Sequence, residues 1–549
     1  MKARTGWTQS RVERALRDVL DEHLLTDALG GDRELLGVVR AIGPVLRRDE
    51  RLRPVVTLPG RRYIAPSQRR ASTGTHYTPP QLASEVAIGA LEPLVYRPGP
   101  LETADRSAWR PRPSEELLGL RVADIAMGSG AFLVAACRYL ADRLVEAWTA
   151  EGEAEALREA RVGVRAAADA EASPLVLRAR RRVAEKCLYG VDVNPLAVEM
   201  AKLSLWLVTM DRERPFGFLD DRFVTGDSLL GLVSMGQLDM LHVDPVAGRW
   251  LHREGALDFS GDWRPLLGQA ADVRRTITAR PVHEMRDVEH KQRLLAEATG
   301  LTRTLTAVAD AVTGVGLAHA GSGATQTDGA FLQLSIDIGN RIGDDEDRLR
   351  RDADANLQAG RPSGLAPRTP LHWPLAFPEV LVDRPDPGFD AIIGNPPFSG
   401  GQKISGGAGS DYGAWLQRWD GGGTKGSADL AARFVLRAQR LLNSRGQLGY
   451  IATNTLLQGA TLRVGLMQAV DRGFTLRRGR SSHRWPSSSA NLEIVDVWAS
   501  RARLGPAAER WLDGEPVPSI GPDLEPVGRV SGRPRPLQEN EDIAFQGSN

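Results

Sequence analysis

The sequence predicts an α/β protein built on a parallel β-sheet that carries helices on its faces. Two observations lead to this prediction. From Arg121 onward, short apolar runs alternate with longer segments of helical periodicity, which is the rhythm of βαβ units. Glycines or acidic residues follow three successive apolar runs, at the strand ends where sheets of this kind bind their ligands.

The composition is that of an ordinary globular protein of 549 residues, long enough for several domains. The net charge is +1, so bulk charge does not indicate a nucleic-acid partner. No apolar run approaches the roughly 20 residues that span a bilayer. The first residues lack the apolar stretch of a signal peptide, so we expect a cytoplasmic location. Cys137 and Cys187 occupy apolar contexts typical of small buried residues, and no metal site is predicted.

Residues 1–70 are expected to form a small helical region, because residues 8–29 place apolar side chains at helical spacing. The first half of the sheet is expected within residues 71–235. Its strands are predicted at 121–126, 187–193 and 222–225, with helices to about residue 144 and over 195–210.

The βαβ rhythm stops after Asp227, and residues 236–370 are expected to be a mostly helical insertion. The sheet resumes within residues 371–500 and gives about seven strands in all. Its remaining strands are expected at 389–393, at 447–452, near Phe474 and at 492–498, with the last two able to form an antiparallel hairpin. Residues 501–549 are rich in Pro, Gly and Arg and are expected to be a linker or the truncated start of a further region.

The most informative segment is 389–398, FDAIIGNPPF, in which a buried strand ends on Asn395, Pro396, Pro397 and Phe398. The prolines stiffen the bend, so the side-chain oxygen of Asn395 and the carbonyl of Pro396 can both accept hydrogen bonds from an incoming amino group. Two such acceptors favour the pyramidal nitrogen that attack on a methyl group requires. Phe398 would supply a stacking surface. A plain strand-ending turn is the alternative interpretation of the same residues.

Three strand ends carry the residues of a nucleotide-type site. Residues 124–132 place glycines between the first strand and its helix, where the backbone can approach a ligand. Asp192 ends the second strand, where it can accept from ribose hydroxyls or cap the following helix. Asp227 follows the third strand, where it can accept from an adenine amino group or act as a cap. Together the three positions predict a nucleoside-type cofactor.

With these residues assembled, the chain resembles the amino-group DNA methyltransferases that use S-adenosylmethionine. Residues 124–132, DIAMGSGAF, look like the glycine motif of that family, with Ile125 and Met127 replacing its proline and frequent cysteine. Residues 74–79, GTHYTP, look like its Tyr-Thr-Pro motif. The order of the motifs is that of the gamma class of adenine-N6 enzymes. The resemblance implies a Rossmann-like, seven-stranded methyltransferase fold with the insertion and the small helical N-terminal region described above.

The resemblance also implies roles for individual residues. Asp124 would face the amino-acid end of S-adenosylmethionine, Asp192 its ribose and Asp227 its adenine. The full set of expected cofactor-binding residues is Thr75, Tyr77, Thr78, Asp124, Ala126, Gly128, Gly130, Phe132, Asp192, Val193, Asp227 and Ser228. The expected catalytic residues are Asn395, Pro396, Pro397 and Phe398. The substrate would be double-stranded DNA with a flipped adenine, because a paired base cannot reach such a pocket.

Contacts to DNA are expected from arginines that crowd a presumed loop before the last strand. The candidates for phosphate binding are Arg477, Arg478, Arg480 and Arg484, with a solvated charged surface as the alternative. Residues 400–426, rich in glycine, are interpreted as a mobile loop that orders over the flipped base or as an inert insertion.

Residues 372–374, HWP, and 377–380, FPEV, resemble the large modification methylases of type IIG restriction and of the BREX and DISARM phage-defence systems. This implies a host-marking methyltransferase, with a second chain expected to supply target recognition. A non-catalytic subunit that binds cofactor or DNA is the first alternative. A protein glutamine methyltransferase, which would present a similar amine to Asn395, is the second.

Overall fold

The computed structural model describes residues 78–152, 173–210, 217–252, 260–341, 345–424, 426–486 and 492–527, together with Thr26, Leu29, Leu36 and Gly37. The chain divides into two compact units, residues 1–70 and 71–549. The helix expected over residues 8–29 lies almost entirely outside the described residues. Thr75 and Tyr77 also lie outside them. The fold below is that of the second unit.

The strands described in this unit form one sheet of nine, in the order β3-β2-β1-β4-β5-β7-β6-β8-β9. They are β1 (Val122–Asp124), β2 (Leu188–Asp192), β3 (Phe223–Thr225), β4 (Phe389–Gly394), β5 (Leu442–Thr453), β6 (Thr475–Arg484), β7 (Glu493–Ser500), β8 (Arg510–Leu512) and β9 (Glu515–Val517). Strands β1 to β5 are parallel, and β7 runs antiparallel to both β5 and β6. Because β1 lies between β2 and β4, a crevice opens at their carboxyl ends.

The predicted Rossmann-like methyltransferase fold is confirmed by this sheet. Strands β1 to β7 match the expected strands, and β6 and β7 form the antiparallel pair at the end. The linker expected after residue 500 is wrong for residues 510–517, because β8 and β9 extend the sheet there. The remaining domain boundaries stay predictions.

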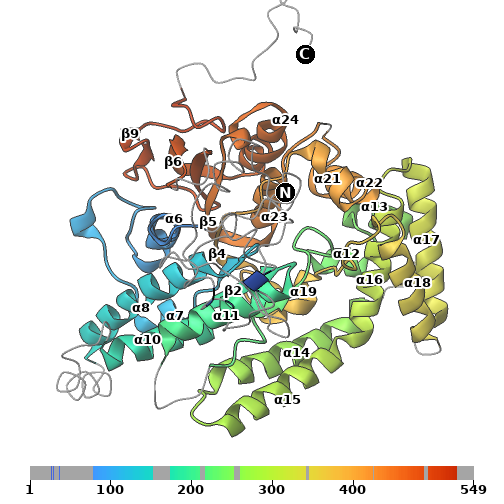
Figure 1. Ribbon diagram of the computed structural model, residues 1–549, viewed down its shortest axis with the longest axis horizontal. Helices are drawn as coiled ribbons and strands as arrows, with labels where there is room; N and C mark the ends of the chain where they lie inside the picture. The colour runs from blue at the N-terminus through green and yellow to red at the C-terminus, as the bar shows by residue number, and fades with distance from the viewer. Residues whose placement is uncertain are drawn as a thin grey trace, which may run out of the picture. The chain divides into compact units, whose positions relative to one another are not determined.

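Helices cover one face of the sheet as a single layer (Figure 1). They are α6 (Pro80–Val95), α7 (Ser114–Leu118), α8 (Ala131–Glu151), α10 (Pro174–Cys187) and α11 (Pro195–Thr209). Their apolar side chains pack with Val122, Ile393 and Ile451 of the sheet in one buried cluster. The packing of this layer holds the glycine turn against the strands that carry the site.

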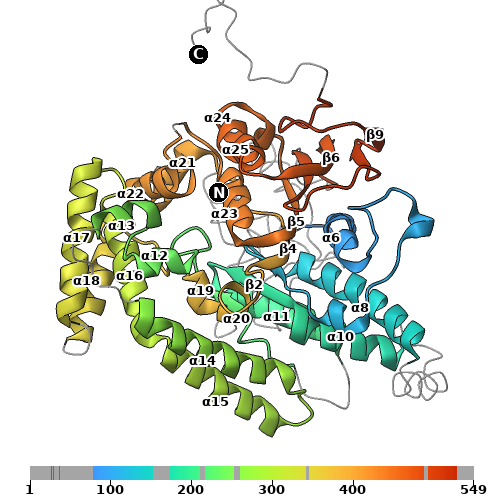
Figure 2. The same ribbon diagram turned by 180° about the vertical axis from the view of Figure 1, so that it is seen from behind.

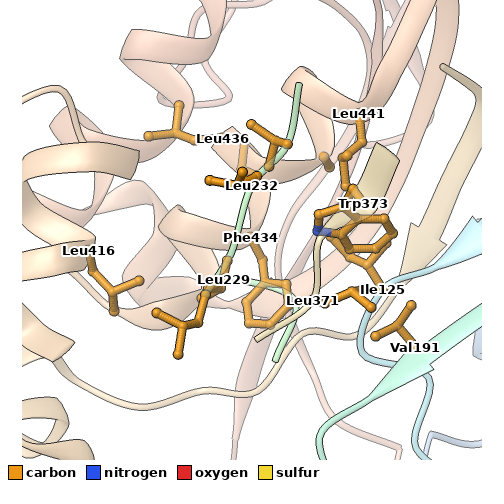
Figure 3. Packing of buried hydrophobic residues seen from close by; sticks show 14 of the residues in the cluster. Ile125, Val191, Leu229, Leu232, Leu371, Trp373, Leu416, Phe434, Leu436 and Leu441 are labelled. Atoms are coloured by element: carbon orange, nitrogen blue, oxygen red, sulfur yellow. The ribbon is translucent and has the colours of Figure 1, made fainter. Parts of the chain in front are cut away.

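The opposite face is covered by α23 (Leu430–Leu441), against which the short helices η5 (Arg463–Met467) and α25 (Gln468–Asp471) pack. Here Trp373, in α19 (Trp373–Ala376), is fully buried. Figure 3 shows its indole among Leu371, Leu441, Ile125 and Val191. Its Nε1 donates to the carbonyl of Ser228 at 3.3 Å, so the residue ties the segment before β4 to the turn after β3.

The insertion between β3 and β4 is helical, as predicted. Its helices are α12 (Met235–Asp239), α13 (Pro245–Leu251), α14 (Ser260–Ala279), α15 (Met285–Leu301), α16 (Arg303–Ala318), α17 (Ala324–Arg341) and α18 (Glu346–Gln358). Helices α14 and α15 lie side by side in both views (Figures 1 and 2). Helices α15 and α16 follow each other directly and meet at Thr302.

A buried ion pair joins this insertion to the sheet. Arg274 of α14 donates to both oxygens of Glu379, at 2.6 and 3.1 Å, and Glu379 belongs to α20 (Pro378–Leu381). The hydroxyl of Tyr189 in β2 also donates to Glu379, at 3.3 Å. Burial raises the pKa of Glu379, but the charge and hydrogen bonds of Arg274, together with the charge of Arg222, outweigh burial, so the net pKa lies below its ordinary value. The carboxylate is therefore held ionised within the protein.

None of the helices in the described part of the chain combines the length and the apolar character that crossing a bilayer would require.

Candidate active site

The candidate active site lies where the carboxyl ends of β1, β2 and β4 meet. In the parallel pairing Asp124 is opposite Gly190, and Val122 is opposite Ala391. Asp192 ends β2, and Asn395 directly follows the last residue of β4. The sheet therefore brings residues from three separate sequence motifs to one edge.

The glycine turn between β1 and α8 crosses over the end of β2. The amide of Met127 donates to the carbonyl of Val191 at 3.0 Å. Gly128 and Gly130 have φ of +53° and +82°, which only glycine adopts without strain. A side chain at Gly130 would also come within 3.1 Å of Ala201 in α11. The turn is thus built to bring the backbone close to the crevice and to α11.

Asp192 holds this turn rather than capping α11. Its two carboxylate oxygens accept from the amide of Gly128 at 2.9 Å and from the amide of Asn194 at 2.8 Å. The cap of α11 is Asn194, whose side chain accepts from Leu196 at 3.1 Å. Burial raises the pKa of Asp192, although the hydrogen bonds from the amides of Asn194 and Gly128 act in the opposite direction. The capping interpretation of Asp192 is therefore wrong.

Asp124 is the most deeply buried carboxylate of the edge. One oxygen accepts from the amide of Ala126 at 3.1 Å, and its Oδ2 has no hydrogen-bond partner among the described residues. Burial raises the pKa of Asp124 to about 8, and the nearby Asp192 adds to the rise. A side chain at Gly394 would approach Asp124 Oδ1 to 2.8 Å, so glycine is required where β4 passes this carboxylate.

Asn395 is oriented by a residue that is 317 positions away in the sequence. Its Nδ2 donates to the hydroxyl of Thr78 at 3.1 Å. Its Oδ1 is buried and, within the described part of the chain, has no hydrogen-bond partner. Because the amide nitrogen is fixed by Thr78, the oxygen is the end of the side chain that remains to accept from a ligand. The Tyr-Thr-Pro motif and the Asn-Pro-Pro-Phe motif thus meet through Thr78.

Tyr450 of β5 is a member of this edge that the sequence did not reveal. It pairs with Gly394 across the parallel β4–β5 ladder. Its hydroxyl is buried and, in the described residues, lacks a hydrogen-bond partner. Burial, followed by the charge of Asp124, raises the pKa of Tyr450 well above its ordinary value. The only signal in the sequence was a tyrosine within an otherwise apolar strand.

The Pro-Pro-Phe segment is anchored beyond the site. Pro396 is buried, and Phe398 is half-buried against the large core cluster. The amide of Ser399 donates to Asp429 at 3.3 Å, and Asp429 also caps α23 by accepting from Ala431. The segment leaving the motif is therefore fixed to the start of α23.

The third acidic residue, Asp227, lies beside a second tyrosine that the sequence did not assign to the site. Asp227 Oδ1 accepts from the amide of Leu229 at 2.9 Å and from the hydroxyl of Tyr412 at 3.1 Å. Burial raises the pKa of Asp227. Ser228 is buried, and its hydroxyl donates to the carbonyl of Ile125 at 2.5 Å. Ser228 thus joins the turns that follow β3 and β1.

The remaining expected cofactor residues differ in accessibility. Val193 is 63% exposed at the end of β2, whereas Ala126 is half-buried in the glycine turn. Phe132 is 2% exposed and packs in the cluster between α8 and the sheet, so it supports the turn from beneath.

The loop expected around the DNA-binding arginines is wrong, because these residues form β6. Arg477 is buried and donates to the carbonyl of Gly89 in α6, and burial lowers its pKa to about 10. Arg480 is paired with Asp496 at 2.6 Å and with Glu85. Arg478 lies over the ring of Trp498. Arg484 is exposed at the end of β6, and Arg478 is exposed as well.

The mobile loop expected over residues 400–426 is also wrong. The segment forms α21 (Gly401–Ala408), α22 (Ser410–Trp415) and η3 (Leu416–Asp420). Trp415 is buried, and its indole donates to the carbonyl of Leu229 at 2.9 Å. The aromatic residues between the glycines are the reason, because burying Tyr412 and Trp415 holds the segment against the protein.

Both cysteines are buried free thiols, as expected, and burial raises the pKa of Cys137 to about 12 and of Cys187 to about 11. Within the described ranges, no group of His, Cys, Asp and Glu is arranged to hold a metal ion.

Solved structures with similar folds include large restriction enzymes. The Type IIL restriction-modification enzyme MmeI, in complex with DNA, has 14% identity and a TM-score of 0.39, with 85% of this chain and 43% of that chain covered. A modification subunit of a putative type I restriction enzyme from Vibrio vulnificus YJ016 has 12% identity and a TM-score of 0.29, with 80% and 47% covered. This chain therefore spans less than half the length of either.

A smaller similar structure is a putative class I S-adenosylmethionine-dependent methyltransferase from Listeria monocytogenes. It has 12% identity and a TM-score of 0.19, with 51% of this chain and 92% of that chain covered. No curated protein matches the chain by sequence.

One protein family matches the sequence over residues 186–468, which is just over half of the chain. The matched segment runs from the end of α10 to the first residue of α25 and contains Asp192, Asp227 and the Asn-Pro-Pro-Phe motif. The family is described as the Eco57I restriction-modification methylase, and the chain belongs to it.

Proposed function

We propose that this chain is a gamma-class DNA methyltransferase that transfers a methyl group from S-adenosylmethionine to N6 of adenine in double-stranded DNA. It would mark host DNA in a restriction-modification or phage-defence system such as BREX or DISARM. The observation that carries this proposal is the orientation of Asn395. Thr78 holds its amide nitrogen, and its buried oxygen is left to accept from an amino group.

The residues at the strand ends fit S-adenosylmethionine. Asp124, with an oxygen that the described residues leave unpaired, suits a ligand ammonium group. Asp192 and Val193 lie at the end of β2, where a ribose and the edge of a purine would be bound. Asp227 suits an adenine amino group. These assignments, with those of Thr75, Tyr77 and Thr78, are part of the proposal.

In the proposed reaction the protein supplies position and hydrogen-bond acceptors. When bound, the cofactor provides a methyl group on a sulfonium sulfur that leaves as a neutral thioether. Asn395 Oδ1 and the carbonyl of Pro396 accept hydrogen bonds from the two N–H groups of the adenine amino group, which localises its lone pair on nitrogen for attack on the methyl carbon. The same two oxygens stabilise the positive charge that develops on that nitrogen. One of its protons then passes to water.

DNA would lie over the carboxyl edge of the sheet, with the target base extruded and stacked on Phe398. Arg484 lies opposite Glu493 in the antiparallel β6–β7 ladder, at the exposed end of β6. It is the most suitable of the four arginines for a phosphate contact. Arg478 remains a candidate with its exposed side chain, whereas Arg477 and Arg480 have intramolecular partners.

We further propose that a second chain supplies sequence recognition. DNA-binding titrations with the isolated chain test this point. Weak binding without preference for a sequence is the expected result, and tight binding to one short sequence would contradict it.

The proposed activity is tested by incubating the full chain with DNA and S-adenosylmethionine and measuring modified nucleosides by mass spectrometry. The variant is Asn395→Ala, and the matched control is Asn340→Ala, an exposed asparagine in α17. N6-methyladenine is expected with the wild type and the control, and is expected to be absent with Asn395→Ala.

Other outcomes are equally informative. Methylcytosine in place of N6-methyladenine would contradict the adenine specificity. Because a partner can be required, the same comparison is made on DNA from the native host with the neighbouring genes intact. Identical host methylation in wild type and Asn395→Ala would favour a protein substrate or a non-catalytic subunit.

A further inference from the structure

Tyr412 links the segment that follows the catalytic motif to the acidic residue at the end of β3. Its hydroxyl donates to Asp227 Oδ1 at 3.1 Å across a separation of 185 residues in the sequence. Tyr412 is 8% exposed. Burial, then the negative charge of Asp227, raises the pKa of Tyr412 well above its ordinary value. Tyr412 therefore keeps its proton and acts as the donor in this hydrogen bond.

The hydrogen bonds to Asp227 are unequally distributed over its two oxygens. Both the amide of Leu229, at 2.9 Å, and the hydroxyl of Tyr412 donate to Oδ1. The backbone amide of Leu230 also acts on this carboxylate, but the described residues place no side-chain donor on Oδ2, and the side chain as a whole is only half-buried. Two donors on one oxygen fix the plane of the carboxylate, because rotation would break both bonds. Oδ2 is then the oxygen that a ligand can reach.

The position of Tyr412 is itself rigidly held. Asp411, the preceding residue, forms a bidentate ion pair with Arg368 at 2.6 and 2.8 Å. Trp415, one turn later, donates to the carbonyl of Leu229 at 2.9 Å, and Arg437 of α23 donates to the same carbonyl. Figure 3 shows Leu229 within the same packed cluster as Leu416 and Phe434. Helix α22 therefore clamps the turn that carries Asp227.

We propose that Tyr412 is a positioning residue that turns Asp227 Oδ2 toward the purine amino group of the cofactor. This inference rests on the proposed function, because it deepens the role of Asp227 in cofactor binding. It makes Tyr412 a determinant of specificity for a purine that carries an amino donor. It also makes part of the segment after the catalytic motif a component of the cofactor site.

The test measures binding of two ligands to the full chain by isothermal titration calorimetry. S-adenosylhomocysteine carries the amino group, and S-inosylhomocysteine carries a carbonyl oxygen in its place. The variant is Tyr412→Phe. The matched control is Tyr189→Phe, which deletes another buried tyrosine–carboxylate hydrogen bond, that to Glu379, away from the cofactor edge.

Wild type is expected to prefer the adenosyl ligand. Tyr412→Phe is expected to reduce the affinity for the adenosyl ligand about fivefold to tenfold and the affinity for the inosyl ligand less than twofold. The preference for the adenosyl ligand therefore falls. Tyr189→Phe is expected to lower thermal stability while keeping the preference of the wild type. A purely structural Tyr412 would weaken both ligands by the same factor or neither, and either result would overturn the inference.

Asp227→Asn provides a second measurement that does not depend on loss of affinity alone. With Oδ1 still held by Tyr412 and Leu229, the new Nδ2 donor would face the purine, so the preference is expected to reverse toward the inosyl ligand. An unchanged preference for the adenosyl ligand in this variant contradicts the inference. A wild-type chain that binds neither ligand would overturn the proposed cofactor together with this inference, which distinguishes the two failures.

Discussion

At the end of β1, Asp124 is a carboxyl group that is almost completely removed from water. The ionised form lacks the solvation it has in the unfolded chain, so burial raises its pKa to about 8. A native protein tolerates such a group where a ligand compensates it, and a cationic ammonium of the proposed cofactor would do so. The residue therefore opposes the stability of the ligand-free chain.

Asp124→Asn is expected to stabilise the ligand-free chain at alkaline pH. Between pH 4 and pH 8 the folded state binds a proton on Asp124 that the unfolded state does not, so wild-type stability falls as pH rises through this range. The asparagine variant lacks this loss, and its advantage should grow to about 2–5 kcal/mol above pH 8. Urea unfolding of both chains at pH 5 and pH 8.5 measures it.

Asp105→Asn is a suitable control for that experiment, because its carboxylate is at the surface and hydrogen bonds from Ser107 lower its pKa. The control should gain no stability at alkaline pH. Parallel pH profiles for wild type and Asp124→Asn would show that Asp124 is solvated in solution.

Thr78 provides a second prediction about a single side chain. Thr78→Val keeps the shape but removes the hydroxyl that accepts from Asn395 Nδ2. The amide can then rotate, and we expect kcat to fall about 10- to 100-fold. Thr78→Ser keeps the hydroxyl and should retain most of the activity. Equal rates for the valine and serine variants would contradict the positioning role of Thr78.

Among the secondary-structure elements, β6 shows how a strand alters the interpretation of a cluster of arginines. Four arginines within ten residues suggested a basic loop, but a strand directs neighbouring side chains to different surroundings. The pairing with β7 shifts register between Leu476 and Arg478, which marks Arg477 as the residue of an irregularity in the ladder. Arg477 then lies under α6, while Arg484 reaches the exposed end of the strand.

The two arginines should therefore respond differently to substitution. Arg484→Ala is expected to weaken DNA binding and to reduce the slope of log affinity against log salt concentration by about 1, with unchanged stability. Arg477→Ala is expected to lower stability by about 1–3 kcal/mol, because it removes a buried hydrogen bond to Gly89, and to leave the salt slope unchanged. Fluorescence anisotropy over a range of salt concentrations, combined with thermal unfolding, measures both effects. Opposite behaviour of the two variants would contradict this assignment.

In the molecule as a whole, a buried network of hydrogen bonds among Arg274, Glu379 and Tyr189 connects the insertion to the sheet. Glu379 comes from the segment that, by resemblance, looked most characteristic of defence-system methylases. In this structure it is a structural anchor for α14, bonded to Arg274 and to Tyr189. Trp373 of the same segment packs in the core.

Breaking this network from one side should be severely destabilising. Arg274→Met removes the ion-pair partner of the buried Glu379 carboxylate and leaves it only the Tyr189 hydroxyl and the charge of Arg222, for which we expect a loss of about 3–5 kcal/mol. The double variant Arg274→Met with Glu379→Leu should recover part of this loss, because no buried charge is left unpaired between the two positions. Urea unfolding of the single and double variants measures the coupling. Additive losses would indicate that the two side chains act independently.

The sheet and much of the candidate site could be predicted from the sequence. The period of the apolar runs identified β1 to β5, because parallel strands are buried on both faces and their sequences show it directly. The positions of Asp192 and Asn395 followed from the same pattern, because each stands at the end of an apolar run, whereas Asp124 was assigned to the site through the resemblance to the methyltransferase family. The helical character of the insertion was also readable from its spacing.

The tertiary structure decided what depends on contacts between distant segments. Sequence spacing carries no information on a hydrogen bond between residues 317 positions apart, so the pairing of Asn395 with Thr78 was not predictable. The same holds for Tyr412 on Asp227, in a segment whose glycines suggested mobility but whose aromatic side chains are buried. Only the folded protein removes these groups from water and pairs them, and this desolvation, which has no counterpart in the linear chain, sets the chemistry of the site.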